Sequence, residues 1–204
     1  YMYGASLSAR VIRQFVYDGY NVDPENRKIF DAVYPHVSGG GRLFSNARFA
    51  QVGRYPRQHE EHQWPSERYP FAYSVTSDPF TKTLDSVLKR PDEDPLVMHT
   101  HTNTEYWQRH ASLGHTNPGN GEDLEIPGNV RIYLIASAQH SGSGMSEADV
   151  TQQLPNSMTT GPMLRSSLTL MHRWVTEGEL PPHSYIPRRD LGTLKWWEDV
   201  VRTF

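Results

Sequence analysis

The chain has 204 residues, of which 36% are hydrophobic and 21% are charged, and its formal net charge at pH 7 is −3. This length and composition suit one large globular domain, and a weak negative charge without a lysine-rich block argues against nucleic acid or an anionic membrane surface as a partner. No apolar run has the length of a membrane span, and the absence of cysteine excludes disulfides and thiol catalysis but leaves the cellular compartment open.

The first predicted elements flank a short turn of small residues. An apolar stub over residues 1–3 precedes Gly4-Ala5-Ser6-Leu7-Ser8, and residues 9–17 repeat apolar side chains at helical spacing. This is nearly the layout of a nucleophile elbow, a strained strand-to-helix turn that exposes a serine hydroxyl. Ser6 is therefore the candidate nucleophile. The alternative is an ordinary tight turn, because Ser8 replaces the usual glycine.

The following segments alternate between strands and helices. Strands are predicted over residues 29–37, 96–101 and 130–136, the last being the clearest. Helices are predicted over residues 104–113 and 162–175. This alternation predicts an α/β fold with a mostly parallel sheet and helices on both faces.

One long segment, residues 43–95, lacks any sustained period. It mixes prolines, aromatic residues and charges. Long irregular segments in compact domains often form lids or binding loops, so this insertion is the candidate cap over the site. Three glycines at residues 39–41 come before it and allow a close backbone approach or a positive φ. The Lys-Ser/Thr ending of a phosphate-binding loop is missing.

Three chemically capable residues follow predicted strands in the order serine, acid, histidine: Ser6, Glu105 and His140. The carboxyl ends of parallel strands meet at one edge of a sheet, so residues distant in sequence converge there. In this hypothesis His140 takes the proton of Ser6, Glu105 fixes the imidazole tautomer, and the backbone N–H of Leu7 stabilises an oxyanion. Such a triad needs no cofactor.

A weaker alternative is a metal site. His99 and His101 lie two residues apart in a predicted strand, so both imidazoles share one face, and Glu105 or His115 would complete a zinc or iron site. The competing interpretation is that these histidines are hydrogen-bonded inside or beside the pocket. We expect no metal, because no third ligand has a compelling spacing.

Further motifs accompany the elbow in one consistent order along most of the chain. They include Tyr17-Asp18-Gly19-Tyr20-Asn21, Gly39-Gly40-Gly41-Arg42, Asn46-Ala47-Arg48-Phe49-Ala50-Gln51, Thr104-Glu105-Tyr106-Trp107, Asn129-Val130-Arg131-Ile132-Tyr133 and Gln139-His140. With these motifs the chain resembles the bacterial α/β-hydrolase-domain family of serine esterases. The resemblance implies an α/β-hydrolase fold and hydrolysis of a small-molecule carboxylic ester, with Ser6 as nucleophile, His140 as general base and Glu105 as triad acid.

The position of the elbow suggests an incomplete sheet. The fold places the elbow after several strands, whereas here it begins at residue 4. A sheet without its central strands has an unpaired edge and an uncovered apolar face. We therefore expect residues 1–204 to be the C-terminal part of the fold, completed by the missing N-terminal half or by a partner chain. The alternative function is a non-catalytic or metal-binding module that retains this scaffold within a larger assembly.

Overall fold

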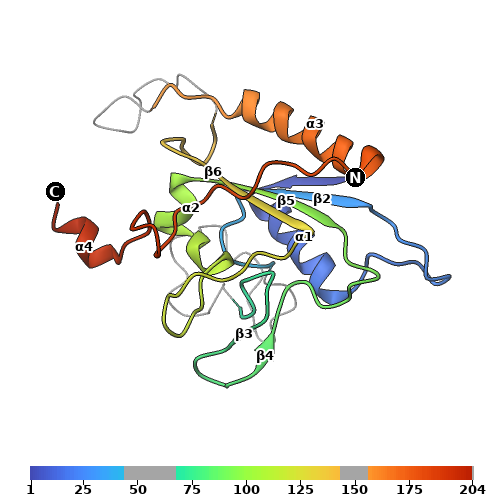
Figure 1. Ribbon diagram of the computed structural model, residues 1–204, viewed down its shortest axis with the longest axis horizontal. Coiled ribbons are helices and arrows are strands. Elements are labelled where there is room, and N and C mark those ends of the chain that lie inside the picture. Colours follow the sequence, from blue (N-terminus) through green and yellow to red (C-terminus); the bar gives the residue numbers. More distant parts are fainter. Residues whose placement is uncertain (44–67, 143–155, 204) are drawn as a thin grey trace, which may run out of the picture.

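The computed structural model describes residues 1–43, 68–142 and 156–203. These residues form one four-stranded sheet in which all neighbouring strands run parallel. Its spatial order is β1 (Met2–Ala5), β2 (Ala32–His36), β5 (Leu96–Thr102) and β6 (Val130–Ile135) (Figure 1). The predicted α/β class with a parallel sheet is confirmed.

Two helices cover opposite faces of this sheet, as predicted. α1 (Leu7–Asp18) lies on one face and α3 (Gly161–Glu177) on the other (Figure 1). Because successive side chains of a strand point to opposite faces, each strand contributes to two cores. The core beside α1 contains Ile12, Val16, Val33, Val97 and Ile132. The core beside α3 contains Tyr34, Met98, Tyr133 and Met171.

The predicted helix over residues 104–113 is wrong in its second half. α2 spans Asn103–Gln108, and a separate 3₁₀ helix, η1, spans Ala111–Gly114. Between them His110 has a φ of 52°, a left-handed conformation that an α-helix does not continue through. The helical pattern of the sequence is therefore divided into two short elements.

The glycine turn after β2 packs directly against this break. The Gly40 N–H donates to the carbonyl oxygen of Arg109 at 2.9 Å. A β-carbon on Gly39, whose φ is 70°, would come within 2.3 Å of the same oxygen. The glycines thus provide both the close approach and the positive φ expected from the sequence.

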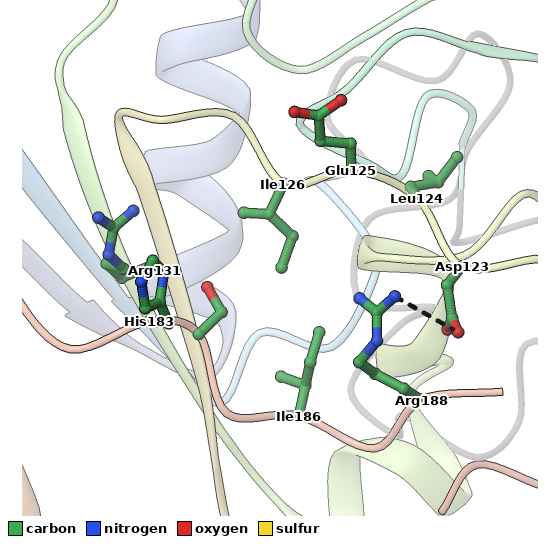
Figure 2. A pocket seen from close by; sticks show the side chains of 9 residues that line it. Asp123, Leu124, Glu125, Ile126, Arg131, His183, Ile186 and Arg188 are labelled. Atoms are coloured by element: carbon green, nitrogen blue, oxygen red, sulfur yellow. Dashed lines mark ion pairs between the residues drawn. The ribbon is translucent and has the colours of Figure 1, made fainter. Parts of the chain in front are cut away.

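The outer edge of β6 is covered by the C-terminal part of the chain. The Tyr185 N–H donates to the Ile132 carbonyl at 3.0 Å, and the Tyr185 carbonyl accepts from the Leu134 N–H at 2.9 Å. Residues 183–188 therefore run beside the start of β6 (Figure 2). The last described element is the short helix α4 (Trp197–Val201).

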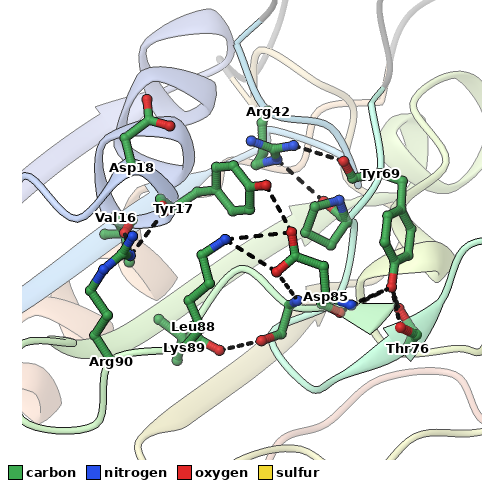
Figure 3. Close-up of polar contacts among 12 residues, drawn as sticks. Val16, Tyr17, Asp18, Arg42, Tyr69, Thr76, Asp85, Leu88, Lys89 and Arg90 are labelled. Carbon is green, nitrogen blue, oxygen red and sulfur yellow. Dashed lines mark hydrogen bonds and ion pairs between the residues drawn. The ribbon is translucent and has the colours of Figure 1, made fainter. Parts of the chain in front are cut away.

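The described part of the predicted cap contains a short hairpin, and residues 44–67 lie outside the described residues. Its antiparallel strands are β3 (Thr76–Ser77) and β4 (Leu84–Asp85). Figure 3 shows how polar contacts attach it to α1: the Tyr17 hydroxyl donates to the Asp85 carboxylate at 2.7 Å, and the Arg42 guanidinium lies 3.6 Å from the centre of the Tyr17 ring. A cap function for residues 43–95 stays a prediction.

The opposite edge of the sheet is β1, which pairs with β2 on one side. Within the described ranges no strand pairs with its other side. Tyr1 and Tyr3, at 52% and 51% exposure, lie along this edge. None of the helices in the described residues combines the length and the apolar character needed to cross a membrane.

Candidate active site

Ser6 occupies the turn between β1 and α1. Its φ of 56° and ψ of −119° put a residue with a β-carbon where glycine is favoured, so the turn is strained. The Ser6 N–H donates to the His36 carbonyl on β2 at 2.9 Å, which holds the turn in place. Gly4 permits the tight packing, because a β-carbon there would lie 2.7 Å from the Ser8 carbonyl oxygen. These are the features of a nucleophile elbow.

His140, which follows β6, contacts both other members of the predicted triad. Its Nε2 lies 3.0 Å from Ser6 Oγ, and its Nδ1 lies 2.5 Å from Oε1 of Glu105. An ionised carboxylate can only accept hydrogen bonds, so this contact assigns the proton to Nδ1. Nε2 is then an acceptor aimed at the Ser6 hydroxyl, which is the arrangement that a general base requires.

Glu105 is fully buried in the first turn of α2. Its Oε2 accepts from the N–H of Thr102 at 2.9 Å and from the Thr102 hydroxyl at 2.5 Å. The first of these bonds, together with the Glu105 N–H donating to the Thr102 side chain, forms the capping box of this helix. Burial opposes ionisation, but the hydrogen bonds from His140 and Thr102 outweigh it and hold the pKa of Glu105 below its ordinary value. The carboxylate is therefore charged and fixed in orientation at neutral pH.

The start of α2 also positions the histidine loop. The backbone N–H of His140 donates to Oγ1 of Thr104 at 3.1 Å. Thr102 and Thr104 thus hold the acid and the histidine from the same helix start. Sequence reasoning did not single out either threonine, although the Thr-x-x-Glu spacing of Thr102 and Glu105 is the signature of a capping box.

Leu7 is the first residue of α1, directly after Ser6. The N–H groups of a first helical turn have no acceptor inside the helix, and the helix dipole adds a partial positive charge at this end. The Leu7 N–H is therefore suited to contact an anion beside the Ser6 hydroxyl.

Comparison with known proteins agrees with this geometry. A family model described as alpha/beta hydrolase domain matches residues 1–200. The chain belongs to this family. No curated protein and no solved structure matches the chain. The family resemblance inferred from the spaced motifs is confirmed at this level, and with it a hydrolase-like scaffold.

In this alpha/beta hydrolase domain the three side chains come from the carboxyl ends of β1, β5 and β6, as the topology of a parallel sheet requires. β2 lies between β1 and β5 and contributes His36, which sequence reasoning missed because no motif marks it. His36 Nδ1 lies 2.7 Å from the Thr100 hydroxyl oxygen. Burial lowers the pKa of His36 to about 4, so this imidazole is neutral at pH 7.

The two histidines of the metal alternative lie side by side on β5, with ring centres 4.0 Å apart. His99 is already engaged: its Nε2 lies 2.8 Å from the Ser38 hydroxyl and its Nδ1 lies 3.0 Å from the Tyr73 hydroxyl. Burial lowers the pKa of His99 and brings that of His101 to about 3. Across residues 1–43, 68–142 and 156–203, no three histidine, aspartate or glutamate side chains are grouped as metal ligands.

Proposed function

We propose that this alpha/beta hydrolase domain is a serine hydrolase that cleaves carboxylic esters through Ser6, His140 and Glu105. The observation that carries the proposal is the 3.0 Å contact between His140 Nε2 and the hydroxyl of a serine held at a φ of 56°. A strained serine with an imidazole in hydrogen-bond reach is the combination that nucleophilic catalysis uses. The buried carboxylate of Glu105 on the far nitrogen completes it.

In the acylation step, Ser6 Oγ attacks the ester carbonyl carbon while its proton passes to His140 Nε2. The carbonyl oxygen becomes an oxyanion, and the Leu7 N–H donates to it. Glu105 stabilises the imidazolium that His140 becomes when it takes the proton. The C–O bond to the alcohol then breaks, His140 returns the proton to the departing oxygen, and the acyl group stays on Ser6.

In the deacylation step the same groups act on water. His140 Nε2 removes a proton from a water molecule, whose oxygen attacks the acyl carbon. The second oxyanion again lies beside the Leu7 N–H. Its collapse breaks the bond to Ser6 Oγ, which takes back the proton from His140, and the carboxylic acid leaves.

Labelling by a fluorophosphonate tests this proposal directly, because the reagent reacts with activated serine hydroxyls. We expect covalent labelling at Ser6, identified by peptide mass spectrometry, and its loss in Ser6→Ala. Ser8→Ala is the matched control, since Ser8 is exposed on the first turn of α1 and should leave labelling unchanged. Labelling that persists in Ser6→Ala would show that Ser6 is not the reactive serine. No labelling of the unsubstituted protein would favour a non-catalytic module.

Among the residues that the structure describes, β1 has a strand partner on one side only, which supports a proposal about partners. In this proposal a further strand, from another part of the fold or from a partner chain, pairs with β1 and covers Tyr1 and Tyr3. Residues 1–204 alone should therefore self-associate and turn over p-nitrophenyl butyrate slowly. A monomer of high activity in light scattering and kinetic assays would contradict this part of the proposal.

A further inference from the structure

The loop that carries His140 contains a residue in a strained backbone conformation. This loop follows β6, and its second residue, Ser137, has a φ of 62°, in the left-handed region that favours glycine. A residue with a β-carbon keeps such a conformation only where its surroundings hold it there. The contacts of Ser137 therefore determine where the chain places His140, three residues further on.

Two asparagine side chains hold the peptide groups on either side of the Ser137 α-carbon. The Ser137 N–H donates to Oδ1 of Asn103 at 3.0 Å. The Ser137 carbonyl accepts from Nδ2 of Asn156 at 2.5 Å. Because φ and ψ relate these two planar groups to each other, holding both of them fixes the conformation of Ser137.

Asn103 also binds the next residue of the loop through its backbone. It is the first residue of α2, and its N–H donates to the Ala138 carbonyl at 3.2 Å. Ala138 is buried, so the loop is anchored in the domain at this point. Two residues later the His140 N–H donates to Thr104, and the His140 ring contacts Glu105. Three consecutive residues of α2 thus hold the loop from its start to the imidazole.

The helix itself does not need an asparagine at position 103. Alanine has the higher intrinsic helix propensity, and Asn103 is exposed. The preceding residue, Thr102, already caps the helix. What asparagine adds at this position is a side-chain acceptor for the Ser137 N–H.

We propose that Asn103 is a positioning residue of this hydrolase, which keeps Ser137 in its left-handed conformation and thereby places the His140 imidazole against the Ser6 hydroxyl. This inference rests on the proposed function, because the proton transfer from Ser6 to His140 is the step that Asn103 supports. That transfer requires hydrogen-bond distance, and the two atoms are 3.0 Å apart. A small displacement of the imidazole is therefore enough to slow the reaction.

The rate of fluorophosphonate labelling at Ser6 tests the inference. Asn103→Ala should lower the maximal labelling rate at least fivefold, with the reagent concentration that gives half this rate unchanged. Asn103→Asp keeps an oxygen acceptor and should label within twofold of the unsubstituted protein. Rates are compared on the alkaline plateau of each pH profile, where the imidazole is neutral, so that a shifted titration does not mimic a displaced ring. Asn120→Ala is the matched control, because the Oδ1 of this exposed asparagine also accepts a backbone N–H, that of Glu122.

Substitutions in the loop test the role of the strained residue. Glycine adopts the left-handed conformation without the penalty of a β-carbon, so Ser137→Gly should raise the labelling rate of Asn103→Ala at least threefold in the double variant. Ser137→Gly alone should label within twofold of the unsubstituted protein. Asn156→Ala frees the carbonyl side of Ser137 and should slow labelling at least threefold.

The outcomes separate this inference from the proposed function, and circular dichroism checks that each variant folds. Normal labelling of Asn103→Ala, or of Asn156→Ala if Asn103→Ala does not fold, would overturn the inference and leave the proposed function standing. A slow Asn103→Ala that Ser137→Gly does not restore would also overturn it, because Asn103 would then act by another route. An unsubstituted protein without labelling at Ser6 would overturn both.

Discussion

His115 should make the folded state lose stability as the pH falls from 7 to 5. The side chain is 2% exposed, and its Nε2 lies 2.9 Å from the Tyr106 hydroxyl. Burial lowers its pKa from 6.5 to about 4. Below pH 6.5 the unfolded chain therefore binds a proton that the folded chain does not bind until about pH 4. The folded state therefore has its full stability above about pH 6.5 and loses this part of it as the pH falls toward 4.

The size of the effect follows from these two pKa values. Proton linkage makes the cost small at pH 7 and about 2 kcal/mol at pH 5, so His115 removes about 2 kcal/mol of stability between these two pH values. His36, whose pKa burial also lowers to about 4, contributes a similar loss. Together these two losses are a large share of the free energy of unfolding of a typical domain, which is about 5–15 kcal/mol.

Urea unfolding at pH 7 and pH 5 measures this loss for the unsubstituted protein and for His115→Gln. The variant lacks the titrating imidazole, so its free energy of unfolding should fall by about 2 kcal/mol less over the same interval. Arg173→Lys, at an exposed position on α3 that does not titrate in this interval, should behave like the unsubstituted protein. If the unsubstituted protein and His115→Gln lose equal stability within about 0.5 kcal/mol, the reasoning from burial is refuted.

Substitutions at three further positions test the site and the residues that support it. Glu105→Gln should slow fluorophosphonate labelling of Ser6 by about 10³- to 10⁴-fold, because the imidazole loses its charged partner and its fixed tautomer; a normal rate would remove Glu105 from the triad. Thr102→Val deletes the hydroxyl bond to the Glu105 carboxylate, worth about 1.5–3 kcal/mol, and should slow labelling about tenfold or more, whereas Thr102→Ser should restore it. Gly4→Ala should lower the free energy of unfolding by about 1–3 kcal/mol in urea titrations, because its β-carbon meets the backbone of Ser8 at 2.7 Å; unchanged stability would show that the turn at Ser6 has room for a β-carbon.

The predictable parts of the fold are the elements whose buried side chains recur at a regular spacing in the sequence. β6 lies inside the run predicted from residues 130–136, and α3 extends the helix predicted over residues 162–175 by a residue or two at each end. The β3–β4 hairpin has two residues in each strand, too few to show an alternation. The break at His110 packs against a glycine turn about 70 residues earlier, a contact that no local pattern can reveal.

The features of the candidate site can likewise be divided into those that the sequence predicts and those that it does not. Ser6, Glu105 and His140 follow strands, so their order in the chain and the parallel topology predict one shared edge. The two bonds from Thr102 to Glu105 depend on how α2 starts, and only the Thr-x-x-Glu spacing indicates them. His36 lies beside the site because its strand, β2, lies between β1 and β5. This position can be assigned only when the sheet order is known.

At position 6, the residue that best suits the backbone conformation differs from the residue that the proposed chemistry needs. Glycine adopts a φ of 56° without the penalty that a β-carbon brings, so Ser6→Gly should yield a protein that resists denaturation better and has no hydroxyl to offer. Under the proposed function, the strain at this turn is the cost of presenting a hydroxyl there, and the domain is less stable for it than the same fold with glycine would be.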